Sequence, residues 1–262
     1  MHSLKVAIQL ASLKQPFRKA LITASKLGAT GVEIDARTQL RPRELGQTGL
    51  RQLRKLLDDL NLQVAAVRFR TRRGYDEPSD LDTRVQATRE AMKLASSLGC
   101  SVVTNRVGRI YEDESDSQWQ QMLGVLNDLG EYGHHVGTWL AAETGLEDGT
   151  QLAQLLRSLP DGMLGIDFNP GLLIINGHCA IESLRQLGPQ VVHVRANDGV
   201  QDISHGHGSE VQLGRGSADF IELIAVLEEF SYRGWFTTER QDSSDPIREL
   251  GMAIKYLKNV MQ

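Results

Sequence analysis

The strongest constraint on the fold of this chain is an alternation of two patterns that repeats eight times along the sequence. A short aliphatic run, often β-branched, is followed each time by a longer stretch with amphipathic helical spacing. This alternation is typical of βα units, because neighbouring parallel strands need a crossover helix between them. The runs that predict strands are 6–10, 31–35, 63–69, 101–105, 138–143, 164–168, 191–195 and 235–239.

Eight strands alternating with eight helices over 262 residues predict a single (β/α)8 TIM barrel, one domain over residues 1–262. A doubly wound open sheet is the competing α/β architecture. Well-marked helices are expected from residue 79 or 80 to 99 and from 246 to 260. The long glycine-rich segment 197–217, which follows the seventh strand, is expected to be an active-site loop.

Composition narrows the class of protein. With 40% hydrophobic and 24% charged residues the chain is of the soluble globular type, and no apolar run is long enough for a membrane span. We therefore expect a cytoplasmic protein with no membrane partner. A formal net charge of -4 does not attract a polyanion, so nucleic acid is not an expected partner. Cys100 and Cys179 lack metal-ligand spacing and predict no disulfide framework, and no feature indicates an oligomeric state.

Side-chain alternation along the strands selects polar residues that should face the barrel interior at the carboxyl ends, where sites in this fold lie. Asp167 and Asn169 share the inward parity of the sixth strand, and His193 and Arg195 share that of the seventh. Burying many charged groups is costly unless they are paired or used, so they indicate a polar mouth for a polyhydroxy ligand. The same rule adds Gln9, Glu33, Asp35, Arg68, Arg70, Glu143 and Glu239.

Two of these carboxylates suit chemistry. Glu143 on the fifth strand and Glu239 on the eighth are candidates for an acid/base pair or for metal ligands. His205, His207 and Glu210 in the glycine-rich segment also have metal-ligand side chains. A flexible loop does not hold ligands at the narrow distances that a metal requires, so we do not expect a metal there.

The arginines of the third strand allow two interpretations. At the mouth, Arg68 and Arg70 can receive a phosphate or carboxylate group of a ligand. Alternatively, they form ion pairs with Glu33 or Asp35 on the second strand.

Six short segments together resemble the sugar phosphate isomerase/epimerase family, the xylose isomerase-like TIM barrels, which include an endonuclease IV branch. The similarity covers essentially the whole chain and is strongest from about residue 161 onward. The segments are VEIDA (32–36), AAETG (141–145), IDFNPG (166–171), HVRAND (193–198), EVQLGRGSADF (210–220) and TTER (237–240).

The resemblance implies a divalent metal (Mn, Mg or Zn) held by Glu, Asp, His and Glu on strands five to eight. Glu143 and Glu239 match the first and last ligands. At the other two ligand positions the family typically has the segments NFDP and HVHAKD. This chain has DFNP and HVRAND, which place Asn169 and Arg195 at those positions. Asn in place of Asp removes one negative charge, and Arg195 supplies one positive charge where the metal supplied two. The formal charge of the site is therefore unchanged. We therefore expect no metal cofactor, and expect Arg195 to donate hydrogen bonds to Glu143, Glu239 or both.

A metal site one layer deeper, built on Asp167 and His193, is the alternative. It is disfavoured because Glu143 and Glu239 would then lie about 6–7 Å higher along their strands. The resemblance also implies a His and an Arg in the ketose epimerase branch, where this chain has Leu172 and Gln201. That activity and the three-metal endonuclease chemistry are therefore not expected.

Two hypotheses for function follow, both in carbohydrate metabolism. The first is an isomerase or epimerase for a small carbohydrate or sugar phosphate, in which Glu143 and Glu239 exchange a proton beside a carbonyl and Arg195 stabilises the enediolate. The alternative is a catalytically inactive, metal-free barrel that binds a sugar or small acid. The residues expected to bind substrate are Arg68, Arg70, Asp167, Asn169 and His193.

Overall fold

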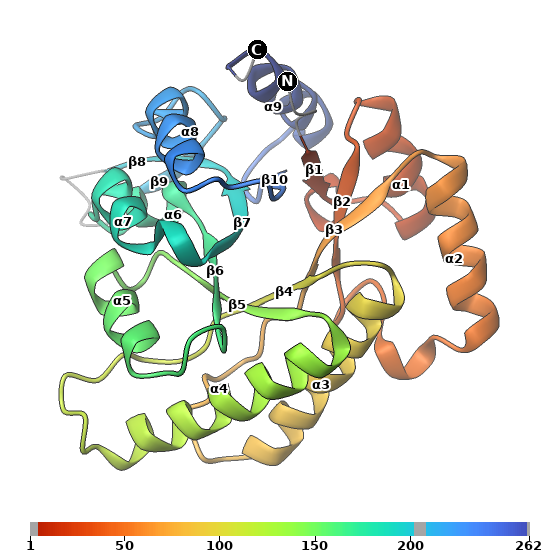
Figure 1. The fold of residues 1–262 in the computed structure, drawn as a ribbon. Helices are drawn as coiled ribbons and strands as arrows, with labels where there is room; N and C mark the ends of the chain where they lie inside the picture. Colours follow the sequence, from red (N-terminus) through yellow and green to blue (C-terminus); the bar gives the residue numbers. More distant parts are fainter. Residues whose placement is uncertain (1–4, 202–207, 261–262) are drawn as a thin grey trace.

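The computed structural model describes residues 5–201 and 208–260. Eight parallel strands close into a barrel in the order β1-β10-β7-β6-β5-β4-β3-β2, so that each strand pairs with two neighbours. Figure 1 looks into this ring of strands, with the helices packed around its outside. The predicted (β/α)8 barrel is therefore confirmed, and the open sheet was the wrong alternative.

Each predicted strand agrees with the structure to within one residue at either end. The barrel strands are β1 (Val6–Gln9), β2 (Gly31–Asp35), β3 (Gln63–Arg68), β4 (Val102–Asn105), β5 (Trp139–Glu143), β6 (Gly165–Phe168), β7 (Val191–Ala196) and β10 (Phe236–Thr238). The register shifts by one residue at Val32/Glu33 and at Ile166/Asp167.

The α-helices in the described ranges number nine, one more than the eight predicted, and three short 3-10 helices accompany them. The additional helix, α6, begins directly after β6, where Asn169 caps it and Pro170 occupies its first position. The α-helices are α1 (Phe17–Lys26), α2 (Gln47–Asp59), α3 (Leu81–Ser97), α4 (Ser117–Val136), α5 (Gly149–Arg157), α6 (Pro170–Ile175), α7 (Ala180–Leu187), α8 (Phe220–Glu229) and α9 (Pro246–Val260). The 3-10 helices are η1 (Leu10–Leu13), η2 (Pro42–Glu44) and η3 (Gly188–Gln190).

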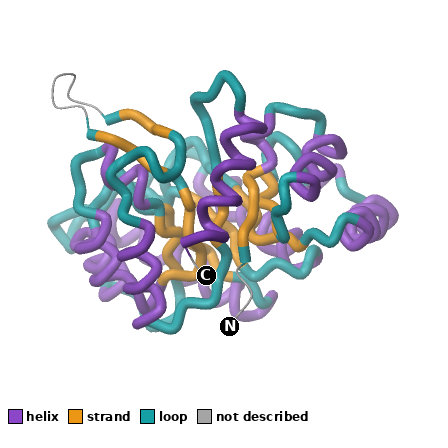
Figure 2. The backbone as a smooth tube through the Cα atoms, turned by 90° about the horizontal axis from the view of Figure 1, so that it is seen from above, coloured by secondary structure: helices purple, strands orange, loops and turns teal. Residues whose placement is uncertain are grey.

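The segment 197–217, predicted as one long loop, contains regular structure. Two short strands, β8 (Asp198–Val200) and β9 (Ser209–Val211), form an antiparallel hairpin there. Figure 2 shows this pair at the rim of the barrel, next to the grey trace. The buried Asp198 carboxylate organises the segment, because it accepts hydrogen bonds from four backbone N–H groups, those of Gly199, Gly214, Gly216 and Ala218.

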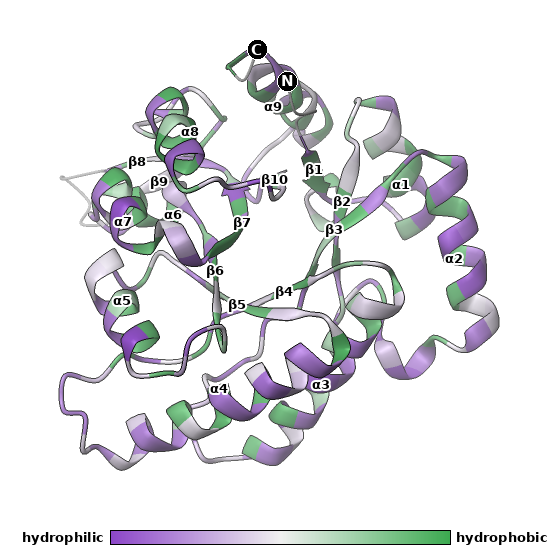
Figure 3. Ribbon diagram, viewed as in Figure 1, coloured by the Kyte–Doolittle hydropathy of each residue, from purple (hydrophilic) through white to green (hydrophobic). Residues whose placement is uncertain are grey.

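The core is aliphatic and lies mainly between the strand ring and the helices. Figure 3 shows hydrophobic residues on the strands and hydrophilic residues on the outer faces of the helices. A second, small cluster of Ala66, Val102 and Ala141 packs together with Val192. Among the described helices we find none with the length and apolarity of a membrane span.

Candidate functional site

Arg195 of β7 lies at the centre of the barrel and is 1% exposed. Its Nε donates to Asp167 Oδ2 at 2.7 Å and lies 3.3 Å from Glu143 Oε1. Its Nη2 donates to Glu33 Oε2 at 2.8 Å, and its Nη1 donates to Glu239 Oε2 at 3.1 Å. One guanidinium therefore contacts four buried carboxylates. The expected hydrogen bond to Glu239 is present, and Glu143 makes an ion pair with the same group.

Three further arginines contact two of these carboxylates. Arg68 Nη1 lies 3.4 Å from Glu239 Oε2. Arg70 donates to Glu143, and Arg106 Nε lies 3.5 Å from the same carboxylate. Counting Arg195 itself, four arginines therefore make ion-pair contacts with the four buried carboxylates. The alternative in which Arg68 and Arg70 pair with Glu33 or Asp35 was wrong, because Arg68 pairs with Glu239, directly after β10, and Arg70 pairs with Glu143 of β5.

His193 joins this network through Asp167, which also binds Arg195. His193 Nδ1 lies 2.7 Å from Asp167 Oδ1, and its Nε2 lies 2.7 Å from Thr237 Oγ1. His193 and Asp167 are fully buried and in direct contact. The register, however, places Glu143 opposite Asp167 rather than a layer above it.

Asn169 presents a donor, not an acceptor, to the network. Its Nδ2 donates to Glu143 Oε1 at 3.1 Å, while its Oδ1 accepts from the N–H of Leu172 at 2.9 Å and so caps α6. Asn169 and Arg195 are each 1% exposed. In place of the open polar mouth predicted at the strand ends, Glu143, Asn169, Arg195 and Glu239 pack directly against one another.

Several other residues complete the network. Gln9 donates to Glu33 at 2.9 Å and to Glu239 at 2.5 Å, as its inward parity allows. Thr104 accepts from Arg195 Nη2 at 2.9 Å. Asp35, by contrast, binds the backbone N–H groups of Arg37 and Thr38 in a turn and takes no part.

Sequence reasoning missed Thr104, Arg106 and Asn197, whose Nδ2 donates to Glu239 Oε1 at 3.3 Å. Thr104 lies one residue before the end of β4, and Arg106 lies one residue beyond it. Arg70 follows β3 by two residues, so a search for arginines just past strand ends would have found Arg106 as well.

The remaining metal-ligand candidates lie in the hairpin segment. His205 and His207 fall outside the described residues. The Glu210 carboxylate accepts from the N–H groups of Gln241 and Asp242 and pairs with Arg240 at 3.0 Å. These contacts join β9 to the segment after β10, which is a structural role.

The divalent metal implied by the family resemblance does not fit the residues of this site. The Arg195 guanidinium stands between Glu143 and Glu239, and Asn169 directs its amino group at Glu143. Both ring nitrogens of His193 have partners, which removes the deeper alternative as well. Within the described ranges, no group of three or more His, Cys, Asp and Glu side chains is placed to hold a metal ion. The site is built around a guanidinium instead.

Opposing effects act on the buried carboxylates. Burial raises the pKa of Glu143, but the positive charges of Arg195, Arg70 and Arg68 outweigh it and hold that pKa at about 2, below the ordinary 4.5. The pKa of Glu33 is also lowered, since burial is outweighed by Arg195 and Arg68. Both groups are therefore ionised at neutral pH.

These shifts predict acid sensitivity. A carboxyl whose pKa is lower in the folded state stabilises the fold above its unfolded pKa and loses that contribution as pH falls through the folded value. We expect Glu143 to contribute about 3 kcal/mol to the free energy of unfolding, lost between pH 4.5 and about 2. Urea denaturation over this range measures the loss, and Glu143→Gln should flatten it. An equally steep loss in that variant would contradict the assignment to Glu143.

A cavity of about 300 Å³ opens beside Glu143, between the loops that follow β3, β4 and β5. Its lining includes two carboxylates, Glu143 and Glu147, and five arginines, so the lining has a formal charge of +3. A concave, positively charged surface of this kind favours an anionic ligand. The five arginines are Arg70, Arg72, Arg73, Arg106 and Arg109.

The family model for xylose isomerase-like TIM barrels matches residues 21–260. The chain belongs to this family. Among its relatives, an inosose dehydratase of Clostridium botulinum is 23% identical over 91% of this chain and 87% of its own length. Solved structures of other proteins share the same fold.

A xylose isomerase domain protein from Planctomyces limnophilus has a TM-score of 0.87 and 22% identity, with 99% of this chain and 98% of that chain covered. A D-psicose 3-epimerase from Clostridium cellulolyticum H10 has a TM-score of 0.79 and 12% identity, with 99% and 100% covered. At these identities the similarity establishes the shared xylose isomerase-like barrel. The relatives and structural neighbours that share this barrel include an inosose dehydratase and a D-psicose 3-epimerase.

Proposed function

We propose that this protein is an isomerase or epimerase for an anionic sugar, a sugar phosphate or sugar acid, bound at the mouth of the barrel. The observation that carries the proposal is the arginine-lined cavity beside Glu143, in which Arg70 and Arg106 cover the buried carboxylate. Epimerisation beside a ketone and loss of water from a ketone both begin with removal of a proton next to the carbonyl. The names of the epimerase and dehydratase relatives therefore support proton transfer as the common step.

In this proposal Glu143 and Glu239 transfer the proton, and the ligand's anionic group draws away the arginines that cover Glu143. Both side chains are 2% exposed, so substrate reaches them only after neighbouring groups move. Arg70 and Arg106, whose side chains are 28% and 42% exposed, are the groups free to turn toward an anion in the cavity. The anion and the Glu143 carboxylate compete for these two arginines. Binding of the anion therefore gives the substrate access to Glu143.

The other polar residues have supporting roles in this mechanism. Arg68 lies beside Glu239, where its guanidinium can stabilise negative charge on the substrate oxygen, while Arg70 binds the anionic group. Arg195 is enclosed by carboxylates and acts as a positioning residue for them. Asn169, Asp167 and His193 hold the same network in place from β6 and β7.

Proton exchange in D2O tests the proposal across a panel of sugars, because it detects removal of the proton whatever product follows. Aldose phosphates, ketose phosphates and sugar acids are incubated with the protein, and proton NMR follows loss of the C–H signal beside the carbonyl. We expect exchange with at least one phosphorylated or carboxylated sugar, and a fall of about 100-fold or more in Glu143→Gln and in Glu239→Gln. Glu228→Gln, at an exposed position on α8, is the matched control.

The second candidate function, a barrel that only binds its ligand, is favoured by the low exposure and full pairing of both carboxylates. The same experiment separates the two. Saturable binding of an anionic sugar without exchange, or exchange that survives both glutamine variants, would overturn the enzymatic proposal.

A further inference from the structure

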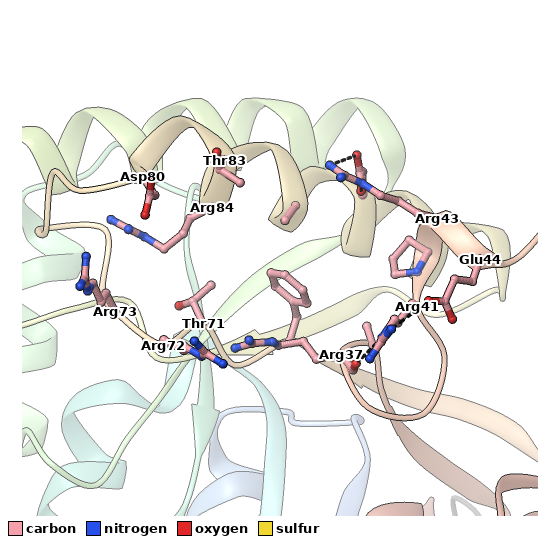
Figure 4. A pocket seen from close by; sticks show the side chains of 15 residues that line it. Arg37, Arg41, Arg43, Glu44, Thr71, Arg72, Arg73, Asp80, Thr83 and Arg84 are labelled. Carbon is pink, nitrogen blue, oxygen red and sulfur yellow. Dashed lines mark hydrogen bonds and ion pairs between the residues drawn. The ribbon is translucent and has the colours of Figure 1, made fainter.

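A second arginine-lined cavity, larger than the one at the mouth, lies between the loop after β2, the loop after β3 and helix α3. Its volume is about 660 Å³, within the usual range for small-molecule sites. Figure 4 shows Arg37 and Arg72 on one side of this cavity, with Thr83 and Arg84 of α3 on the other. The outer cavity, as we call it, shares only Thr71, Arg72 and Arg73 with the mouth cavity, so this short segment separates the two.

The charge of the outer cavity is strongly unbalanced. Its lining includes three acidic residues and six arginines, a formal charge of +3. The acidic residues are Glu44, Asp80 and Glu90, and the arginines are Arg37, Arg41, Arg43, Arg72, Arg73 and Arg84.

Two of the arginines are neutralised locally, because Arg43 pairs with Glu90 at 2.8 Å and Arg41 with Glu44 at 2.9 Å. The other four are matched by a single carboxylate in the lining, that of Asp80. The excess positive charge is therefore carried by Arg37, Arg72, Arg73 and Arg84, which approach the cavity from both sides.

The contacts of these four arginines leave donors for a ligand. Arg37 Nη1 donates to the backbone oxygen of Arg70 at 2.5 Å, and Arg84 donates to the backbone oxygens of Glu77 and Ser79. Neither arginine is paired with a carboxylate by these bonds. Figure 4 shows no interaction of Arg72 or Arg73 with the side chains drawn around the cavity. Guanidinium groups gathered in this way match the oxygens of phosphate, which they bind through paired N–H groups.

The rest of the wall is apolar. Ala36, Pro42, Phe69 and Ala87 line the cavity between the charged groups. An inorganic anion would leave this surface uncovered, whereas the organic part of a larger ligand would bury it. We propose that the outer cavity binds an organic diphosphate of the nucleoside diphosphate kind, whose charge of about -3 matches that of the lining. This site is separate from the sugar site proposed at the mouth.

Titration calorimetry with ADP as the probe tests this inference on the full chain, with inorganic pyrophosphate and adenosine as partial probes. Thr83 is exposed on α3 and faces the cavity, so Thr83→Glu and Thr83→Gln differ only in charge there. We expect saturable ADP binding that is tighter than that of either partial probe. Thr83→Glu should weaken it at least tenfold, and Thr83→Gln less than threefold.

A variant at the mouth shows where the ligand binds. Arg106 lines the mouth cavity and not the outer one, so Arg106→Gln should leave ADP affinity within twofold. Loss of ADP binding in Arg106→Gln with normal binding in Thr83→Glu would overturn the inference, because ADP would then occupy the mouth. Equal weakening by Thr83→Gln and Thr83→Glu, equal affinity for adenosine, or no ADP binding at millimolar concentration would each overturn it too.

Discussion

Replacement of Arg195 by alanine is expected to lower the free energy of unfolding by about 3–5 kcal/mol at pH 7, because it leaves buried carboxylates without their shared cation. Arg195 is 1% exposed and contacts Glu33, Glu143, Asp167 and Glu239. Urea denaturation of the variant and the native protein measures the difference. Arg51→Ala, at an exposed position on α2, is the matched control and should change stability by less than about 0.5 kcal/mol.

The pH dependence of Arg195→Ala identifies the cause of that loss. Without the guanidinium, burial raises the pKa of Glu33 and of Glu143, because Arg195 is the largest of the charges that lower both. A carboxyl with a raised folded pKa favours the fold at low pH and destabilises it as pH rises through that value. The deficit relative to the native protein should therefore shrink from pH 7 to pH 5. A deficit that stays constant with pH would point to lost packing rather than to unpaired charge.

The double variant Asn169→Asp with Arg195→His is expected to gain a divalent metal site at the centre of the barrel. The exchange removes the guanidinium between Glu143 and Glu239 and supplies an anionic oxygen and an imidazole, the ligand types the family uses. Mn²⁺ at about 100 times its dissociation constant should stabilise the variant by about 3 kcal/mol. Thermal unfolding in Mn²⁺ and in EDTA measures this gain.

Two controls keep this expectation testable even if the metal-free double variant is unstable. Asn169→Asp alone retains Arg195, so its unfolding temperature should not respond to Mn²⁺. If the double variant unfolds without metal, refolding should require Mn²⁺, since metal binding then supplies folding free energy. A native protein that responds as strongly as the double variant would show that Arg195 does not occupy the metal position.

The sequence predicted the barrel and the inward residues well because both depend on local patterns. Strand parity selected Glu143, Asn169, Arg195 and Glu239, and all four meet in one network. The motif departures at 169 and 195 also correctly indicated a guanidinium between the carboxylates.

Features that depend on side-chain reach and register were not predictable in the same way. Arg195 extends across the barrel to Glu33 on β2, and the one-residue shift in the β6–β7 pairing changes which side chains lie opposite each other. The β8–β9 hairpin is also invisible to periodicity, because each of its strands has only three residues. Its order comes from the non-local contacts of Asp198.

The reach of Arg195 also limits how this barrel can be recombined with its relatives. Its partners come from β2, β4, β5, β6 and the residue directly after β10, so both halves of the barrel contribute to one charge-balanced centre. A chimera would join one half of this barrel to the other half of a relative. If the relative has a different residue at position 195, buried carboxylates or guanidinium groups at the centre would be left without partners. Half-barrel exchange in this lineage therefore requires coordinated substitution at the centre, whereas the outer helices can diverge one position at a time.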